Sequence, residues 1–75
     1  RVFPNPVKNI VEFSIAKPFT GSIGVRIFDQ KGRLVRTASI TSDNTRVGMS
    51  DLPAGVYLYE LRGKDWQSSG KMVKE

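Results

Sequence analysis

The stretch that decides the fold is DLPAGVYLYELRG, residues 51–63, in which a turn sequence leads directly into a strand sequence. Within it, Leu52-Pro53-Ala54-Gly55 places proline, whose φ is fixed, at the second position of a turn and glycine at the fourth. From Val56 to Arg62 the side chains then alternate in character, as they do in a strand with one face in a core. The residues predicted to face that core are Tyr57, Tyr59 and Leu61.

The same period of two recurs along most of the chain, and no segment carries a persuasive helical period. The other predicted core residues are Val11, Phe13 and Ile15, then Ile23, Val25 and Ile27, then Val47 and Met49, and finally Met72. The segment from Arg33 to Ile40 is ambiguous. Val35 heads one of its faces, and the other would carry Leu34, Ala38 and Ile40 together with Arg36.

Turn signals separate these segments at close spacing. Asp29-Gln30-Lys31-Gly32 suits a type I turn whose glycine takes a positive φ. Gly63-Lys64, between Arg62 and Asp65, suits a two-residue hairpin loop. We expect Gly32 and Gly55 to occupy positions where a Cβ would clash. Six or seven short antiparallel strands in 75 residues predict an all-β fold, a small two-sheet sandwich in a single domain over residues 1–75.

The composition argues against an enzyme. Histidine and cysteine are both absent, so the chain lacks the usual general base and the thiol nucleophile. The acids Asp29, Asp43, Asp51 and Asp65 each sit in a separate turn rather than in a catalytic pair. Ser42-Asp43-Asn44 is polar, but it lacks the spaced ligands of a calcium loop. We therefore predict no catalytic residue, no metal site and no cofactor.

The net charge and the apolar content are compatible with more than one kind of partner. Twelve basic residues against seven acids give a net charge of +5, which favours anionic partners such as nucleic acid or lipopolysaccharide, or simply a solvated basic surface. No basic-aromatic RNA motif is present, so we expect no nucleic-acid partner. No apolar run approaches the roughly 20 residues of a membrane span. The chain opens with Arg1 and shows no secretory signal, so we expect it to be a piece of a longer polypeptide.

Taken together, four segments resemble the type A C-terminal sorting domains of the type IX secretion system of Bacteroidetes-type bacteria. The segments are VFPNPVKNIVEFSI, VRIFDQKGRLVRT, MSDLPAGVYLYELRG and KMVKE. They carry, in the family's order, an aromatic-Pro-Asn-Pro opening, an Asp-x-x-Gly-basic-x-Val hairpin, a Leu-Pro-x-Gly-x-Tyr strand start and a lysine-rich apolar end. Glu75 departs from the family pattern, because many members end on a basic residue.

The resemblance implies an immunoglobulin-like sandwich of about seven strands and a role as a secretion signal. Such a domain directs its cargo from the periplasm across the outer membrane to the cell surface or the medium. A shuttle or receptor and the translocon recognise it, and a sortase-type cysteine peptidase usually removes it. The motif and turn residues carried over are Pro4, Asn5, Pro6, Asp29, Gly32, Arg33, Val35, Leu52, Pro53, Gly55 and Tyr57.

The predicted recognition tail is Gly70, Lys71, Met72, Val73, Lys74 and Glu75, lying as an edge strand that can recruit a partner strand. Several alternatives stay open. The tail can be an ordinary closing strand, Tyr57 and Tyr59 an exposed platform for sugars, and Asn5 either a turn former or part of a junction shown to the sortase. The chain can be a monomer or a strand-swapped dimer. The rival function is an immunoglobulin-like structural or carbohydrate-binding adhesion module, since fold alone does not decide function.

Overall fold

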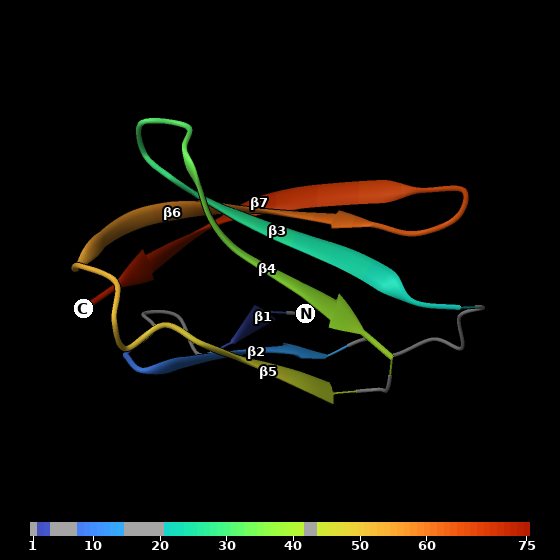
Figure 1. The fold of residues 1–75 in the computed structure, drawn as a ribbon, viewed down its shortest axis with the longest axis horizontal. Helices are drawn as coiled ribbons and strands as arrows, with labels where there is room; N and C mark the ends of the chain where they lie inside the picture. The colour runs from blue at the N-terminus through green and yellow to red at the C-terminus, as the bar shows by residue number, and fades with distance from the viewer. Residues whose placement is uncertain (1, 4–7, 15–20, 42–43) are drawn as a thin grey trace.

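A computed structural model describes residues 2–3, 8–14, 21–41 and 44–75 of the chain. These residues form seven strands and no helix (Figure 1). The strands are β1 (Val2–Phe3), β2 (Ile10–Ser14), β3 (Ile23–Asp29), β4 (Leu34–Ile40), β5 (Asn44–Gly48), β6 (Gly55–Arg62) and β7 (Gln67–Lys74). The predictions for Pro4, Asn5, Pro6, Ile15, Ser42 and Asp43 lie outside the described residues. Within the described ranges there is also no helix of the length and apolar character that a membrane span requires.

The strands form two antiparallel sheets, which confirms the predicted all-β sandwich. One sheet has the order β1-β2-β5, and the other has the order β4-β3-β6-β7. Figure 1 shows the four-stranded sheet lying across the three-stranded one, with the amino-terminal strands in the smaller sheet. β7 is therefore an edge strand, since β6 is its one neighbour in the four-stranded sheet.

The core lies between the two sheets and consists almost entirely of residues that the period of two selects. The buried apolar side chains are Val11, Phe13, Ile23, Val25, Ile27, Ile40, Val47, Met49, Tyr57, Leu61 and Met72. Tyr59 is half-buried and packs against this cluster, with its ring edge-to-face on Phe13 at a centroid distance of 5.7 Å. The predictions for the described core residues are thus confirmed, with Tyr59 at the margin of the core.

The ambiguous segment is resolved by a β-bulge. Ile27 pairs with Arg36, but the next residue, Phe28, pairs with Leu34, so Val35 is the additional residue on β4. The prediction that Leu34 shares a face with Arg36, Ala38 and Ile40 is therefore wrong. The bulge turns Leu34 to the outer face of the sheet, where it is half exposed, while Ile40 is fully buried.

The predicted β6–β7 loop is wrong by one position. The Gly63 N–H donates to the Trp66 carbonyl at 2.9 Å, so the central loop residues are Lys64 and Asp65. Gly63 does not have a positive φ. Glycine fits at this position because the space beside it is occupied: a Cβ there would collide with the Trp66 indole nitrogen.

The expected clash at Gly32 and Gly55 comes from the local backbone and not from residues packed nearby. A Cβ added at either position would meet no heavy atom within 4 Å outside the glycine and its two chain neighbours. Both residues do have positive φ values, +87° for Gly32 and +155° for Gly55. The constraint is therefore the backbone conformation itself, which side chains rarely adopt.

Gly70 on β7 lies opposite Tyr59 on β6, and its lack of a side chain leaves room for the tyrosine ring. A Cβ at Gly70 would overlap the Tyr59 hydroxyl and ring, and that ring is held against Phe13. We expect Gly70→Ala to lower the free energy of unfolding by roughly 1–3 kcal/mol, the usual cost of an overpacked site.

The matched control is Gly48→Ala, also in a strand, where an added Cβ meets nothing within 4 Å and φ is not positive. Chemical denaturation of the two variants measures the difference. Equal stabilities would contradict the requirement for space at Gly70.

Candidate recognition site

Three of the four motif segments meet at one end of the sandwich, although they are far apart in the sequence. In the four-stranded sheet Asp29 lies opposite Tyr57, Tyr57 lies opposite Met72, and Gly55 lies opposite Lys74. We call this region the motif end and define it as Asp29–Val35, Leu52–Tyr57 and Gly70–Glu75. In Figure 1 the β3–β4 turn, the start of β6 and the carboxyl terminus all lie on the left.

The Asp29 carboxylate organises the β3–β4 turn. One oxygen accepts hydrogen bonds from the N–H groups of Lys31 and Arg33, each at 2.9 Å, and the other accepts from Arg33 Nε at 2.9 Å. The Gly32 N–H donates to the Asp29 carbonyl at 3.0 Å, and the Asp29 N–H donates to the Arg33 carbonyl at 2.9 Å. The predicted glycine turn is confirmed, and its aspartate and arginine side chains are used within it.

The same hydrogen bonds change the acidity of Asp29. The Arg33 N–H, the largest cause, lowers the pKa of this carboxyl below its ordinary value, and the Arg33 side chain and the Lys31 N–H act in the same direction. Partial desolvation opposes them. The ionised carboxylate is therefore the form that the folded turn stabilises.

The Leu52–Tyr57 segment is held by a tyrosine corner. The Tyr57 hydroxyl donates to the Pro53 carbonyl, four residues earlier, at 2.6 Å, and only 4% of the residue is exposed. The Leu52 N–H donates to the Met49 carbonyl at 3.0 Å, so a hydrogen-bonded turn lies directly before Pro53. The buried tyrosine ring with its hydroxyl at the rim was the expected arrangement, and it does not form an exposed platform for sugars.

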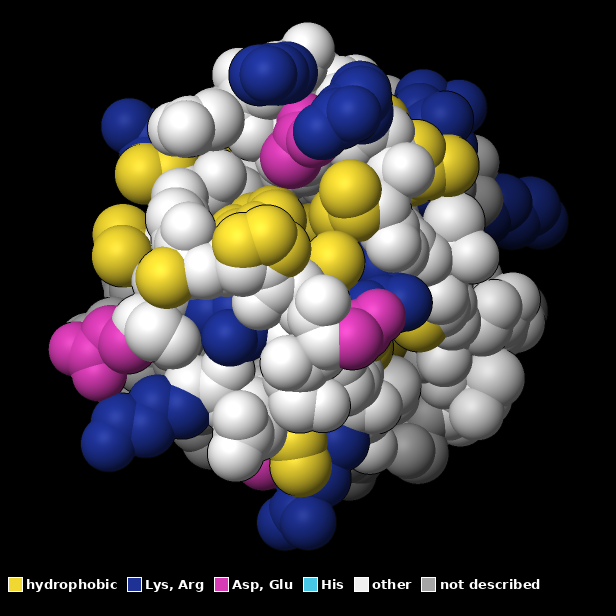
Figure 2. All heavy atoms as spheres, turned by 60° about the vertical axis from the view of Figure 1, so that its left-hand side comes forward, with side chains coloured by type: hydrophobic (Ala, Val, Ile, Leu, Met, Phe, Trp, Pro, Cys, Tyr) yellow, Lys and Arg dark blue, Asp and Glu magenta, His cyan; other side chains and the backbone are white. Residues whose placement is uncertain are grey.

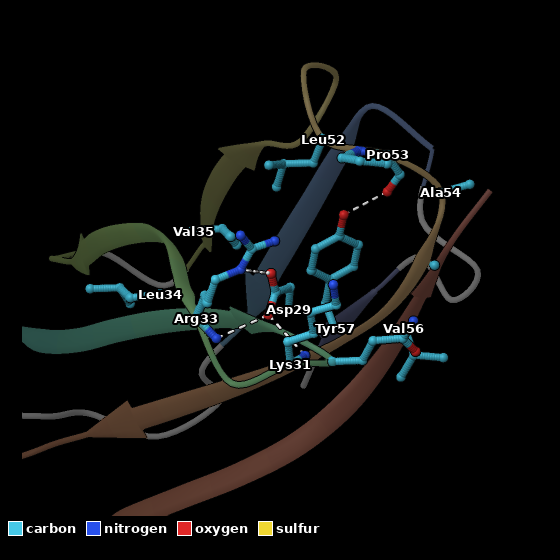
Figure 3. Close-up of a pocket in the computed structure, with 12 residues that line it drawn as sticks. Asp29, Lys31, Arg33, Leu34, Val35, Leu52, Pro53, Ala54, Val56 and Tyr57 are labelled. Carbon is cyan, nitrogen blue, oxygen red and sulfur yellow. Dashed lines mark hydrogen bonds and ion pairs between the residues drawn. The ribbon is translucent and has the colours of Figure 1, made fainter.

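A pocket of about 500 Å³ separates these two segments. All four of the following residues line it, and Figure 3 shows Tyr57 between the Asp29 and Arg33 pair on one side and Pro53 on the other. The lining residues are Asp29, Gln30, Lys31, Arg33, Leu34, Val35, Leu52, Pro53, Ala54, Gly55, Val56 and Tyr57. Its walls are thus the two motif turns themselves. Figure 2 shows this side of the molecule, with apolar side chains near the middle and lysine and arginine side chains above and below them.

The predicted tail splits into two sets of side chains. Met72 and Lys74 point into the sandwich, with 1% and 8% of their surface exposed, whereas Lys71, Val73 and Glu75 are exposed. The tail is therefore both a closing strand, paired with β6 along its length, and an outer edge with an exposed side-chain row. The position of the edge strand is as predicted, and recognition of the tail stays a prediction.

An ion pair that the sequence did not reveal lies next to this tail. Arg36, on the inner face of β4, donates from Nη2 to the Asp51 carboxylate. That hydrogen bond is the main reason that the pKa of Asp51 is lowered, and the charge of Lys74 contributes in the same direction. Asp51 was predicted as a turn former alone. Its partner could not be found from alternation, because the packing of the loop before β6 beside β4 is a tertiary contact.

We expect Asp29→Asn to lower the melting temperature at pH 7, because the neutral amide cannot replace the carboxylate that accepts three hydrogen bonds. A carboxyl whose pKa is lowered by folding stabilises the folded state above its unfolded pKa of about 3.9, and this contribution is lost as the pH falls through the folded pKa. The difference in melting temperature between wild type and variant should therefore shrink as the pH is lowered from about 5 to about 2. A gap that stays constant over this range would contradict the assigned role of the carboxylate.

We expect Tyr57→Phe to lower the free energy of unfolding by about 1 kcal/mol, because it leaves the Pro53 carbonyl without its 2.6 Å donor. Tyr59→Phe is the matched control. Its hydroxyl has no hydrogen-bond partner among the described residues. Urea denaturation of both variants measures the difference, and an equal loss for the two would argue against the tyrosine corner.

Comparison with known protein families shows a match over the whole chain. A family described as the secretion system C-terminal sorting domain matches residues 1–75. No curated protein sequence matches the chain. The matched range includes all three segments of the motif end, as well as Phe3–Pro6.

Proposed function

Because the chain belongs to the family of secretion system C-terminal sorting domains, which are sorting signals of type IX secretion, we propose that it works through its motif end. In this proposal the outer-membrane shuttle or receptor and the translocon bind the motif end and the exposed side of the β7 edge. The cargo fused to the domain then passes from the periplasm to the cell surface or the medium.

The observation that carries the proposal is the meeting of three family motifs at one end of the fold. The Asp29–Val35 turn and the Leu52–Tyr57 segment enclose one pocket, and Lys74 lies opposite Gly55 at its margin. A receptor that serves many cargoes needs a surface independent of what precedes the domain. The motif end is such a surface, because turn hydrogen bonds and sheet pairing fix its backbone.

The β7 edge is the part of this surface best suited to strand addition. An edge strand can pair with a strand of a partner protein, and lysine on such an edge limits indiscriminate pairing. Lys71, Val73 and Glu75 stand exposed at alternate positions of the tail. We further propose that a sortase-type cysteine peptidase removes the domain from the delivered cargo.

Removing the whole tail is a poor test, because it would take Met72 out of the core. A sharper variant combines Lys71→Ser, Val73→Thr and Glu75→Gln, which changes the exposed side chains and keeps Met72 and Lys74. We expect a periplasmic reporter fused before residue 1 to reach the surface or the medium in a host with type IX secretion. The variant should reduce this delivery at least about tenfold, as expected when the central contacts of an interface are lost.

The matched control is Gln67→Ser with Ser69→Thr, which alters exposed positions of the same strand away from the motif end. It should deliver the reporter normally. Retention of the reporter carrying the unaltered, folded domain in the periplasm would contradict the proposed function. Intact mass of the delivered reporter tests removal of the domain, since an unshortened product would contradict cleavage.

A further inference from the structure

The outer face of the four-stranded sheet is divided into an apolar half and a polar half. Phe28 and Leu58 follow the buried residues Ile27 and Tyr57 in their strands, so they point away from the core. Leu34 lies opposite Phe28, Phe28 lies opposite Leu58, and Val56 lies opposite Val73 in the next row. We call this set the outer stripe; its members are Leu34, Phe28, Leu58, Val56 and Val73.

The outer stripe ends abruptly. The next two rows of the same face contain polar, charged or glycine residues. They are Thr37, Arg26, Glu60 and Ser69 in one row, and Ser39, Gly24, Arg62 and Gln67 in the other. The apolar half is the one that adjoins the motif end.

Strand formation does not account for the outer stripe. Leu34, Leu58 and Val73 are 50%, 43% and 43% exposed, and leucine is not among the residues that strands favour. Single exposed apolar residues are ordinary, but Leu34 and Leu58 both lie opposite Phe28 of the strand between them, and Val73 lies diagonally from Leu58 on β7. Contiguous exposed apolar surface of this kind is typical of an interaction site.

The charges beside the outer stripe indicate what covers it. Arg26 stacks over the Phe28 ring at 5.4 Å and pairs with Glu60 at 2.7 Å, so both charges are matched within the domain. Lys71 lies opposite Leu58 at the end of the row, and no described acid lies within ion-pair distance of it. A complementary surface is therefore apolar at its centre and carries a carboxylate opposite Lys71.

We propose that the outer stripe is a second docking surface of the domain, for a protein of the type IX machinery that presents apolar side chains with carboxylates beside them. This inference rests on the proposed function and extends the proposed surface from the motif end and the β7 edge across the outer face of the four-stranded sheet. Leu58 on β6 belongs to this face and lies outside both the motif end and the tail, whereas Leu34 is shared with the motif end, so Leu58 separates the two surfaces by experiment.

The test uses the reporter fusion with Leu34→Thr and Leu58→Thr together, and with Leu58→Thr alone, since threonine suits exposed strand positions. Lowered delivery by the folded Leu58→Thr variant alone supports the outer stripe, because Leu34 also lies in the motif end. Ile10→Thr is the matched control, because Ile10 is 46% exposed on a strand of the other sheet. Lys71→Glu is compared with Lys64→Glu, an exposed lysine in the β6–β7 loop, which changes the net charge equally. Melting temperatures of all variants show which of them are folded, and each single leucine variant replaces the pair if the pair unfolds.

We expect the leucine pair to lower delivery about tenfold or more without unfolding, while Ile10→Thr stays within about twofold of wild type. Lys71→Glu should lower delivery and Lys64→Glu should not.

Delivery by the folded leucine pair at the wild-type level would overturn the inference and leave the proposed function standing. Equal effects of the two lysine variants on delivery would overturn the inference that the partner presents a carboxylate to Lys71. Loss of binding to phosphatidylglycerol vesicles in the leucine pair would assign the stripe to a membrane instead. Failure of the unaltered fusion to leave the periplasm would overturn both proposals.

Discussion

The constraint on which the structure depends is the register of β3, β6 and β7, in which Asp29 lies opposite Tyr57 and Tyr57 lies opposite Met72. This pairing places Ile27, Leu61 and Met72 in one core, and it brings three distant motifs to one end of the molecule. A slip of one residue would exchange the buried and exposed faces of a strand. It would bury the outer stripe and expose the core, so the fold and the proposed recognition surface depend on the same register.

The motif residues of the two turns therefore stabilise the local backbone conformation. The Asp29 carboxylate accepts its hydrogen bonds from Lys31 and Arg33 of its own turn, and the Tyr57 hydroxyl donates to the Pro53 carbonyl. In a domain of this size the core is small and the net stability modest, so such local bonds matter. What remains for a partner is the shape they create, together with exposed side chains such as those of Lys71 and Leu58.

Much of this arrangement could be predicted from the sequence, because strand alternation and turn chemistry are local. The period of two identified the described core, and Asp29 and Gly32 identified the β3–β4 turn. The errors arose where tertiary contacts decide. The bulge at Val35 turns Leu34 outward, and the indole of Trp66, rather than a turn type, requires Gly63. The Arg36–Asp51 pair and the outer stripe depend on which strands become neighbours, and alternation within one strand does not specify that.

The central claim is that the domain is recognised as a folded surface and not as a linear tail. The most direct measurement compares reporter delivery with the folded fraction of the domain in Ile27→Val and Ile27→Ala. These variants change a fully buried side chain that lies outside the motif end, and they cost about 1 and 2–5 kcal/mol. We predict that delivery falls in proportion to the folded fraction at the growth temperature. Full delivery by an unfolded Ile27→Ala domain, with its tail sequence intact, would contradict the account.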